Sequence, residues 1–336
     1  MRLLVLFLVA FTAHPESLIV TPHRTRHSPL IRGGALSGDG RTLLTWGDGL
    51  FSRDLPRLHA NRISAGSFAD GGCFVDGGLV LQSGPDLGDL TIRRPPGWRP
   101  ELIDTLAGMH DCMAATLLGH RGFLMIHRFS QVRFYEPPAR PGDPWIATDL
   151  YSIYTPSKQT GLLLADIDGD GLIDIVCGNY WIKSPTSFEL PWRLFAINTY
   201  SEVDDSGMLQ LALTSPADNL IVSQGHMRDA RLTWFEKPDD PKRLWIGHRL
   251  GDQFHFVNPH ALAAADFNAD GKIDFVVGER NEANSRLFVF LNEAGSFRGE
   301  QIGRGTEMIS IWKLRGKSLL SIGPSAVTLW NYDFRK

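Results

Sequence analysis

One short pattern occurs twice in this chain, at residues 163–178 and again at residues 263–278. In each copy a small apolar run enters, oxygen-bearing side chains follow at positions 1, 3, 5 and 9, and a β-branched run leaves. These side chains are Asp166, Asp168, Asp170 and Asp174 in the first copy and Asp266, Asn268, Asp270 and Asp274 in the second. Because the flanking runs match as well, an ordinary Asp/Gly turn is the weaker interpretation of either copy.

The spacing of these oxygens suits a hard cation. Calcium takes about six to eight oxygen ligands at about 2.3–2.6 Å, and alternate side chains of a tightly curled loop converge on one point. Gly171 and Gly271 stand at position 6, where the chain must turn sharply and a Cβ would clash. A backbone carbonyl of Leu172 or Lys272 is expected at position 7. The sequence therefore predicts two calcium sites, the first binding more tightly because it has four carboxylates and the second three.

The two loops differ from EF-hands, because the last carboxylate comes at position 9 and a strand-like run follows it. They resemble the FG-GAP/VCBS repeat, the calcium-loop repeat of integrin alpha-subunit propellers and of many secreted bacterial proteins. The resemblance implies a seven-bladed β-propeller with calcium held between the first two strands of a blade.

A period of about 50 residues extends beyond the two loops. Aromatic strands followed by proline turns recur at 132–138, 180–185 and 232–238, and a tryptophan precedes a short strand at Trp98, Trp145, Trp192 and Trp245. Each unit then holds four short strands, which predicts an all-β propeller in one domain, residues 17–336. The units are expected to start near Gly34, Gly66, Asp111, Gly161, Leu209, His260 and Met308.

The last unit offers three strands, at 309–314, 318–322 and 326–332. The strand-like segment 17–22 has no unit of its own. We predict that it pairs as the fourth strand of the last blade and closes the ring.

Residues 1–16 predict a secretory signal, since one positive charge precedes a ten-residue apolar run. A buried first strand is the alternative. A secreted or periplasmic, monomeric protein is expected. No other apolar run approaches a membrane span, and a net charge of −3 gives no support for nucleic-acid binding. The sparse, odd set of cysteines, Cys73, Cys112 and Cys177, is expected to be buried free thiols.

Histidines are the candidates for catalysis. His110 and His260 precede first strands at equivalent points of two units, and His226 and His255 lie in other inter-strand segments. Imidazoles around the channel mouth would bind zinc or act as general bases, although structural histidines are the more frequent case. Trp46, Trp98 and Trp181 would stack on sugars if exposed, but core packing is favoured.

The sequence favours a calcium-stabilised binding or adhesion scaffold over an enzyme. Its partner, protein or carbohydrate, is expected on the face opposite the calcium loops, formed by the connections 136–144, 183–191 and 236–243. The alternative is a lyase or hydrolase acting on saccharides, with His110 and His260 at the central channel. An interaction module of a larger envelope assembly is a third interpretation.

Overall fold

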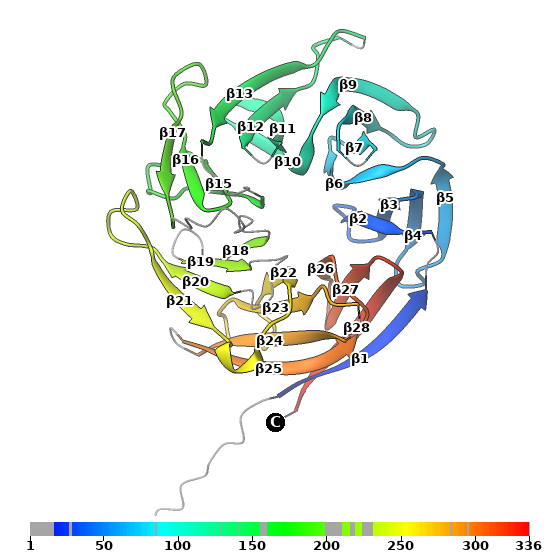
Figure 1. The fold of residues 1–336 in the computed structure, drawn as a ribbon, viewed down its shortest axis with the longest axis vertical. Helices are drawn as coiled ribbons and strands as arrows, with labels where there is room; N and C mark the ends of the chain where they lie inside the picture. The colour runs from blue at the N-terminus through cyan, green and yellow to red at the C-terminus, as the bar shows by residue number, and fades with distance from the viewer. Residues whose placement is uncertain are drawn as a thin grey trace, which may run out of the picture.

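A computed structural model describes residues 17–26, 29–84, 86–128, 130–140, 142–154, 160–198, 210–215, 219–223, 231–282, 284–293 and 296–335. The expected signal segment 1–16 and His226 lie outside these ranges. The described strands form seven antiparallel four-stranded sheets arranged around a central axis (Figure 1). In all but the last, four consecutive strands pair in chain order.

We number the sheets along the chain. Sheet 1 comprises β2 (Ile31–Leu36), β3 (Thr42–Gly47), β4 (Gly49–Asp54) and β5 (Ala60–Ser64). Sheet 2 comprises β6 (Phe68–Val75), β7 (Gly78–Ser83), β8 (Gly88–Arg93) and β9 (Pro100–Ala107). Sheet 3 comprises β10 (Met109–Leu117), β11 (His120–His127), β12 (Gln131–Glu136) and β13 (Ile146–Ser152).

Sheet 4 comprises β14 (Leu162–Ala165), β15 (Asp174–Cys177), β16 (Tyr180–Lys183) and β17 (Arg193–Ala196). Sheet 5 comprises β18 (Gln210–Ser215), β19 (Asn219–Ser223), β20 (Leu232–Glu236) and β21 (Ile246–Leu250). Sheet 6 comprises β22 (Pro259–Ala265), β23 (Asp274–Glu279), β24 (Ser285–Glu293) and β25 (Ser296–Gly305). Sheet 7 comprises β26 (Ser310–Lys313), β27 (Ser318–Gly323), β28 (Ala326–Arg335) and β1 (Ser17–Arg26).

The first strand of each sheet lies nearest the axis, as Figure 1 shows for β2, β6, β10, β18, β22 and β26. Each of these inner strands contacts the inner strand of the next sheet, and β26 in turn contacts β2. Second strands such as β15 and β23 are buried along their whole length, because neighbouring sheets cover both of their faces. This explains their continuous apolar runs, where a sheet with one wet face would show alternation.

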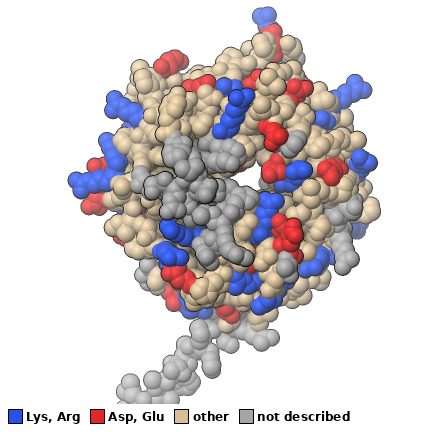
Figure 2. Space-filling model, viewed as in Figure 1, with Lys and Arg blue, Asp and Glu red and all other residues tan. Residues whose placement is uncertain are grey.

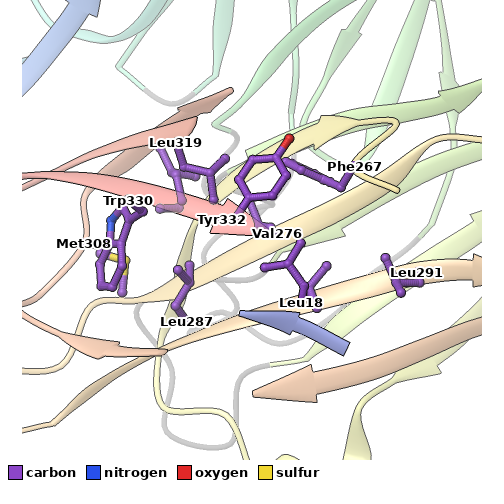
Figure 3. Close-up of a cluster of buried hydrophobic side chains, with 12 residues drawn as sticks. Leu18, Phe267, Val276, Leu287, Leu291, Met308, Leu319, Trp330 and Tyr332 are labelled. Carbon is purple, nitrogen blue, oxygen red and sulfur yellow. The ribbon is translucent and has the colours of Figure 1, made fainter. Parts of the chain in front are cut away.

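The last sheet combines both ends of the chain. Strand β1 pairs antiparallel with β28 along ten residues, from Ser17 opposite Arg335 to Arg26 opposite Ala326. Leu18 is 2% exposed and belongs to a cluster that also contains Leu287 of sheet 6 and Trp330 of sheet 7 (Figure 3). The N-terminal strand is therefore part of the hydrophobic core that joins sheets 6 and 7.

The expectation of three free thiols was wrong for two of the cysteines. Cys73 of β6 and Cys112 of β10 form a disulfide, with their Cα atoms 5.6 Å apart. The inner strands of sheets 2 and 3 are neighbours, so residues far apart in sequence face each other across the two sheets. Cys177 is a buried free thiol, as predicted.

The longer connections do not lie opposite the aspartate loops, contrary to the expectation from the sequence. In an antiparallel sheet of consecutive strands, the connection between strands one and two emerges on the same side as that between strands three and four. Lys183 and Ser184, which begin one of these longer connections, contact the loop between β14 and β15. The connections 136–144, 183–191 and 236–243 thus share the face of the two aspartate loops.

Within the described ranges no helix is long and apolar enough to cross a membrane.

Candidate metal centre

The loop between β14 and β15 is held by its own aspartates. Asp166 Oδ1 accepts hydrogen bonds from the backbone N–H groups of Gly169 and Asp170, at 2.8 and 3.1 Å, and its Oδ2 accepts one from Gly171 at 2.9 Å. Gly171 has a φ of +84°, in the left-handed region that suits glycine. The chain accordingly curls around the Asp166 carboxylate.

The loop between β22 and β23 shares two of these three internal bonds. Asp266 Oδ1 accepts from the N–H of Asp270 at 3.1 Å and its Oδ2 from Gly271 at 2.9 Å, and Gly271 also has a φ of +84°. Asp270 Oδ1 accepts from the N–H of Lys272, and Asp170 Oδ1 from that of Leu172, both at 2.9 Å. The sequence repeat is therefore a repeat of conformation.

The aspartates at position 9 anchor both loops to their sheets. Asp174 and Asp274 are 0% exposed. Asp174 accepts from the N–H of Ile167 at 3.1 Å and of Ser184 at 2.8 Å, and Asp274 accepts from Phe267 and Asn292 in the same way.

Burial raises the pKa of Asp174 to about 6, although the two backbone N–H groups act in the opposite direction. Burial likewise raises the pKa of Asp274. A nearby cation would offset the cost of keeping these buried carboxylates charged.

The first loop brings three carboxylates together. Asp166, Asp168 and Asp174 each offer an oxygen, and these oxygens lie within 4.8 Å of one another. Ligands that touch one calcium ion at about 2.4 Å are at most about twice that distance apart. Asp168 Oδ1 is buried and has no hydrogen-bond partner in the described part of the chain. An orphaned carboxylate oxygen inside a group of three carboxylates fits a calcium ligand set.

Lysines approach both loops. The Lys183 ammonium at the end of β16 bonds Oδ2 of Asp168 and Oδ2 of Asp170. In the second loop, Lys272 Nζ lies 3.7 Å from Asp270 Oδ2 and is more exposed. Sequence reasoning missed Lys183, because it follows the loop by a whole strand. A divalent cation in the first loop would compete with this ammonium for two of its predicted ligands.

The histidine candidates occupy equivalent places in the fold. His110 stands at the irregularity in pairing between Met109 and Asp111, and His260 at that between Pro259 and Ala261. His260 is buried, and its Nδ1 lies 2.8 Å from the Ile309 carbonyl oxygen of the next sheet, which assigns it a structural contact. His255 is exposed on a loop.

No metal-sized cluster in the described ranges includes a histidine. Figure 2 shows an opening at the centre of the ring, with acidic and basic side chains interspersed around its described rim. Beside His110, burial raises the pKa of Asp111 to about 6, and backbone N–H groups of Cys112, Leu162 and Gly161 partly offset that effect.

The tryptophans pack as the favoured interpretation predicts. Trp46 and Trp181 are 2% and 0% exposed, and Trp46 Nε1 donates to the Ala69 carbonyl at 3.0 Å. Trp98 packs partly buried against the cluster that contains Trp46.

Comparisons with known proteins bear on the fold. The β-propeller domain of Cps50 (Swd1) from Myceliophteria thermophila, known from a crystal structure, aligns with a TM-score of 0.61 over 94% of this chain and 99% of that chain. This chain is a β-propeller. The predicted all-β propeller of four-stranded blades is confirmed. Sequence identity is 16%, so the likeness shows the fold alone. No protein-family model and no curated protein matches the sequence of this propeller.

Proposed function

We propose that this propeller is a secreted, calcium-stabilised scaffold that binds a protein or carbohydrate partner. The observation that carries the proposal is the first loop, where three carboxylates converge and Asp168 Oδ1 has no other partner in the described part of the chain. The matching second loop, and the likeness of both to FG-GAP/VCBS repeats, support calcium as the ion. Asp166, Asp168, Asp170, Asp174 and the Leu172 carbonyl would hold one ion. The equivalent ligands of the second are Asp266, Asn268, Asp270, Asp274 and the Lys272 carbonyl.

Calcium would supply charge neutralisation and no reaction chemistry in this proposal. It stabilises the folded state by mass action, because an unfolded loop does not gather the ligands. A site of about 10⁻⁴ M affinity in about 1 mM calcium adds about 1.4 kcal/mol.

The disulfide supports secretion. Bonds such as Cys73–Cys112 persist in oxidising compartments and are rare in the cytosol. The apolar run at residues 3–12 is consistent with a signal segment.

We further infer that the seven sheets are seven blades of a complete ring that β1 closes. Its ten-residue pairing with β28 supports this inference. Deleting residues 17–24 should then lower the melting temperature, and an unchanged melting temperature would contradict closure by this strand.

The test of the proposal is metal content. Protein purified without chelator should contain about two calcium ions per chain by mass spectrometry, and chelation should lower its melting temperature. Asp166→Ala and Asp266→Ala should each remove one ion. Asp39→Asn is the matched control, because it removes an exposed carboxylate from the corresponding connection of sheet 1. A protein that contains no calcium and whose melting temperature does not change with chelator would refute the proposal. A stoichiometric transition metal lost on changing His110 and His260 would favour the saccharide enzyme instead.

A further inference from the structure

A groove beside the first aspartate loop is lined by residues of the longer connections that follow β16 and β20. Figure 1 shows the strands β16 and β20 in neighbouring sheets. The volume of the groove is about 370 Å³. Apolar surface from Leu190, Pro191 and Phe195 forms much of its lining, and Leu190 is 48% exposed. Three cations also line it: Lys183, Arg193 and Lys242.

The charges of this groove are unbalanced. Asp170 also lines it, but its Oδ2 is bonded to Lys183. Arg193 and Lys242 are exposed, and neither forms an ion pair within the described ranges. The acidic residues of the two connections, Glu189, Asp239 and Asp240, do not line the groove. Glu189 accepts a hydrogen bond from the hydroxyl of Ser187, and Asp240 accepts one from the backbone N–H of Lys242 and lies 3.9 Å from the Arg243 side chain.

The strand register increases this imbalance. Lys183 of β16 lies directly opposite Arg193 of β17, and like charges in such a pair destabilise a sheet. The corresponding pairs of sheets 3 and 5 are Glu136 with Ile146 and Glu236 with Ile246. The paired cations of sheet 4 therefore replace an acid and an aliphatic residue found in the two neighbouring sheets.

We propose that this groove binds an extended peptide in which an acidic side chain stands beside an apolar one. Carboxylates suit the exposed Arg193 and Lys242, and Arg binds a carboxylate through two parallel hydrogen bonds. The apolar lining is large enough for one aliphatic or aromatic side chain.

The groove and the aspartate loop share Lys183. A cation bound in the loop takes over Asp168 and Asp170 and leaves the ammonium free for the groove. Calcium should therefore tighten peptide binding, and peptide should tighten calcium binding by the same factor. This coupling rests on the proposed calcium site, whereas the peptide groove does not.

The experiment is selection from a phage-displayed library of random peptides on the full chain, followed by titration of the enriched peptides. Enriched peptides should combine an acidic and an apolar residue. Their affinity should fall about tenfold or more when Arg193→Glu and Lys242→Glu are combined. Arg243→Glu is the matched control, since this exposed arginine belongs to the same connection but does not line the groove.

Four outcomes would overturn the proposal or a part of it. Peptides without acidic residues, or peptides that bind the double variant as well as the control, refute the groove. Binding of polygalacturonate that depends on the same two cations, with no peptide enriched, assigns the groove to an acidic saccharide instead. Equal peptide affinity in calcium and in chelator, for a protein shown to bind calcium, refutes only the coupling through Lys183.

Discussion

The Cys73–Cys112 disulfide gives the sharpest prediction about stability. The bond closes a loop with a sequence separation of 39 residues. In the chain-entropy model, closing a loop of this size removes about 13 cal/mol/K from the unfolded state, or about 4 kcal/mol at 25 °C. With an unfolding entropy of about 2.1 cal/mol/K per residue over about 320 residues, that free energy corresponds to about 6 °C in melting temperature.

The perturbation is the double variant Cys73→Ala/Cys112→Ala, measured by thermal and denaturant unfolding without reductant. Because each alanine also deletes a buried sulfur, Cys177→Ala is the control: it removes a buried sulfur without breaking a bond. The double variant should lose about 4 kcal/mol beyond twice the cost of that control. Reductant should destabilise the natural protein and leave the double variant unchanged.

Alkylation of the unfolded, unreduced protein gives an independent readout. One thiol should react before reduction and three after it, as one disulfide and one free cysteine require. Three reactive thiols before reduction would refute the assignment of this bond. So would a double variant that loses no more stability than twice the cost of Cys177→Ala.

Three further changes test other parts of the structure. Lys183→Met removes the ammonium that would compete with the proposed calcium ion for Asp168. Calcium titration should then show about tenfold tighter binding at the first loop, and an unchanged affinity would contradict the competition. Asp111→Asn tests a carboxyl whose folded pKa, about 6, exceeds its unfolded value of 3.8. That group favours folding below pH about 4, and its contribution is lost as pH rises through about 6. The free energy of unfolding of the variant, measured in urea, should therefore rise relative to that of the natural protein by up to about 3 kcal/mol between pH 4 and pH 8. A difference that does not change with pH would contradict this. Leu18→Ala should cost about 2–5 kcal/mol, while the exposed Thr21→Ala on the same strand should cost little; equal effects would remove β1 from the core.

The strand architecture was predictable from the sequence because each strand has a local sequence pattern and that pattern recurs in several units. The aromatic runs predict strands and the prolines that follow them predict turns. Their common period indicates that the strands group into similar sheets. The loop conformation was predictable for the same reason: Asp166 and Gly171 interact within five residues of each other.

The errors came from contacts between residues far apart in the sequence, both between units and within one unit. Pairing of Cys73 with Cys112 depends on the relative register of two inner strands, and no local pattern specifies it. Lys183 reaches Asp168 from the third strand of its sheet, beyond the span of the loop motif. The longer connections were placed on the wrong face by an error of topology, because alternate connections of an antiparallel sheet emerge on the same side.

The pairing of β1 with β28 also has a consequence for folding during synthesis. Strand β1 is synthesised before all the other described strands, and its pairing partner β28 is synthesised after them. Until β28 is made, the edge of β1 is unpaired and Leu18 lacks part of the cluster that buries it, and such surfaces aggregate or recruit chaperones. If β1 closes the ring as we infer, the ring stays open until β28 has been synthesised.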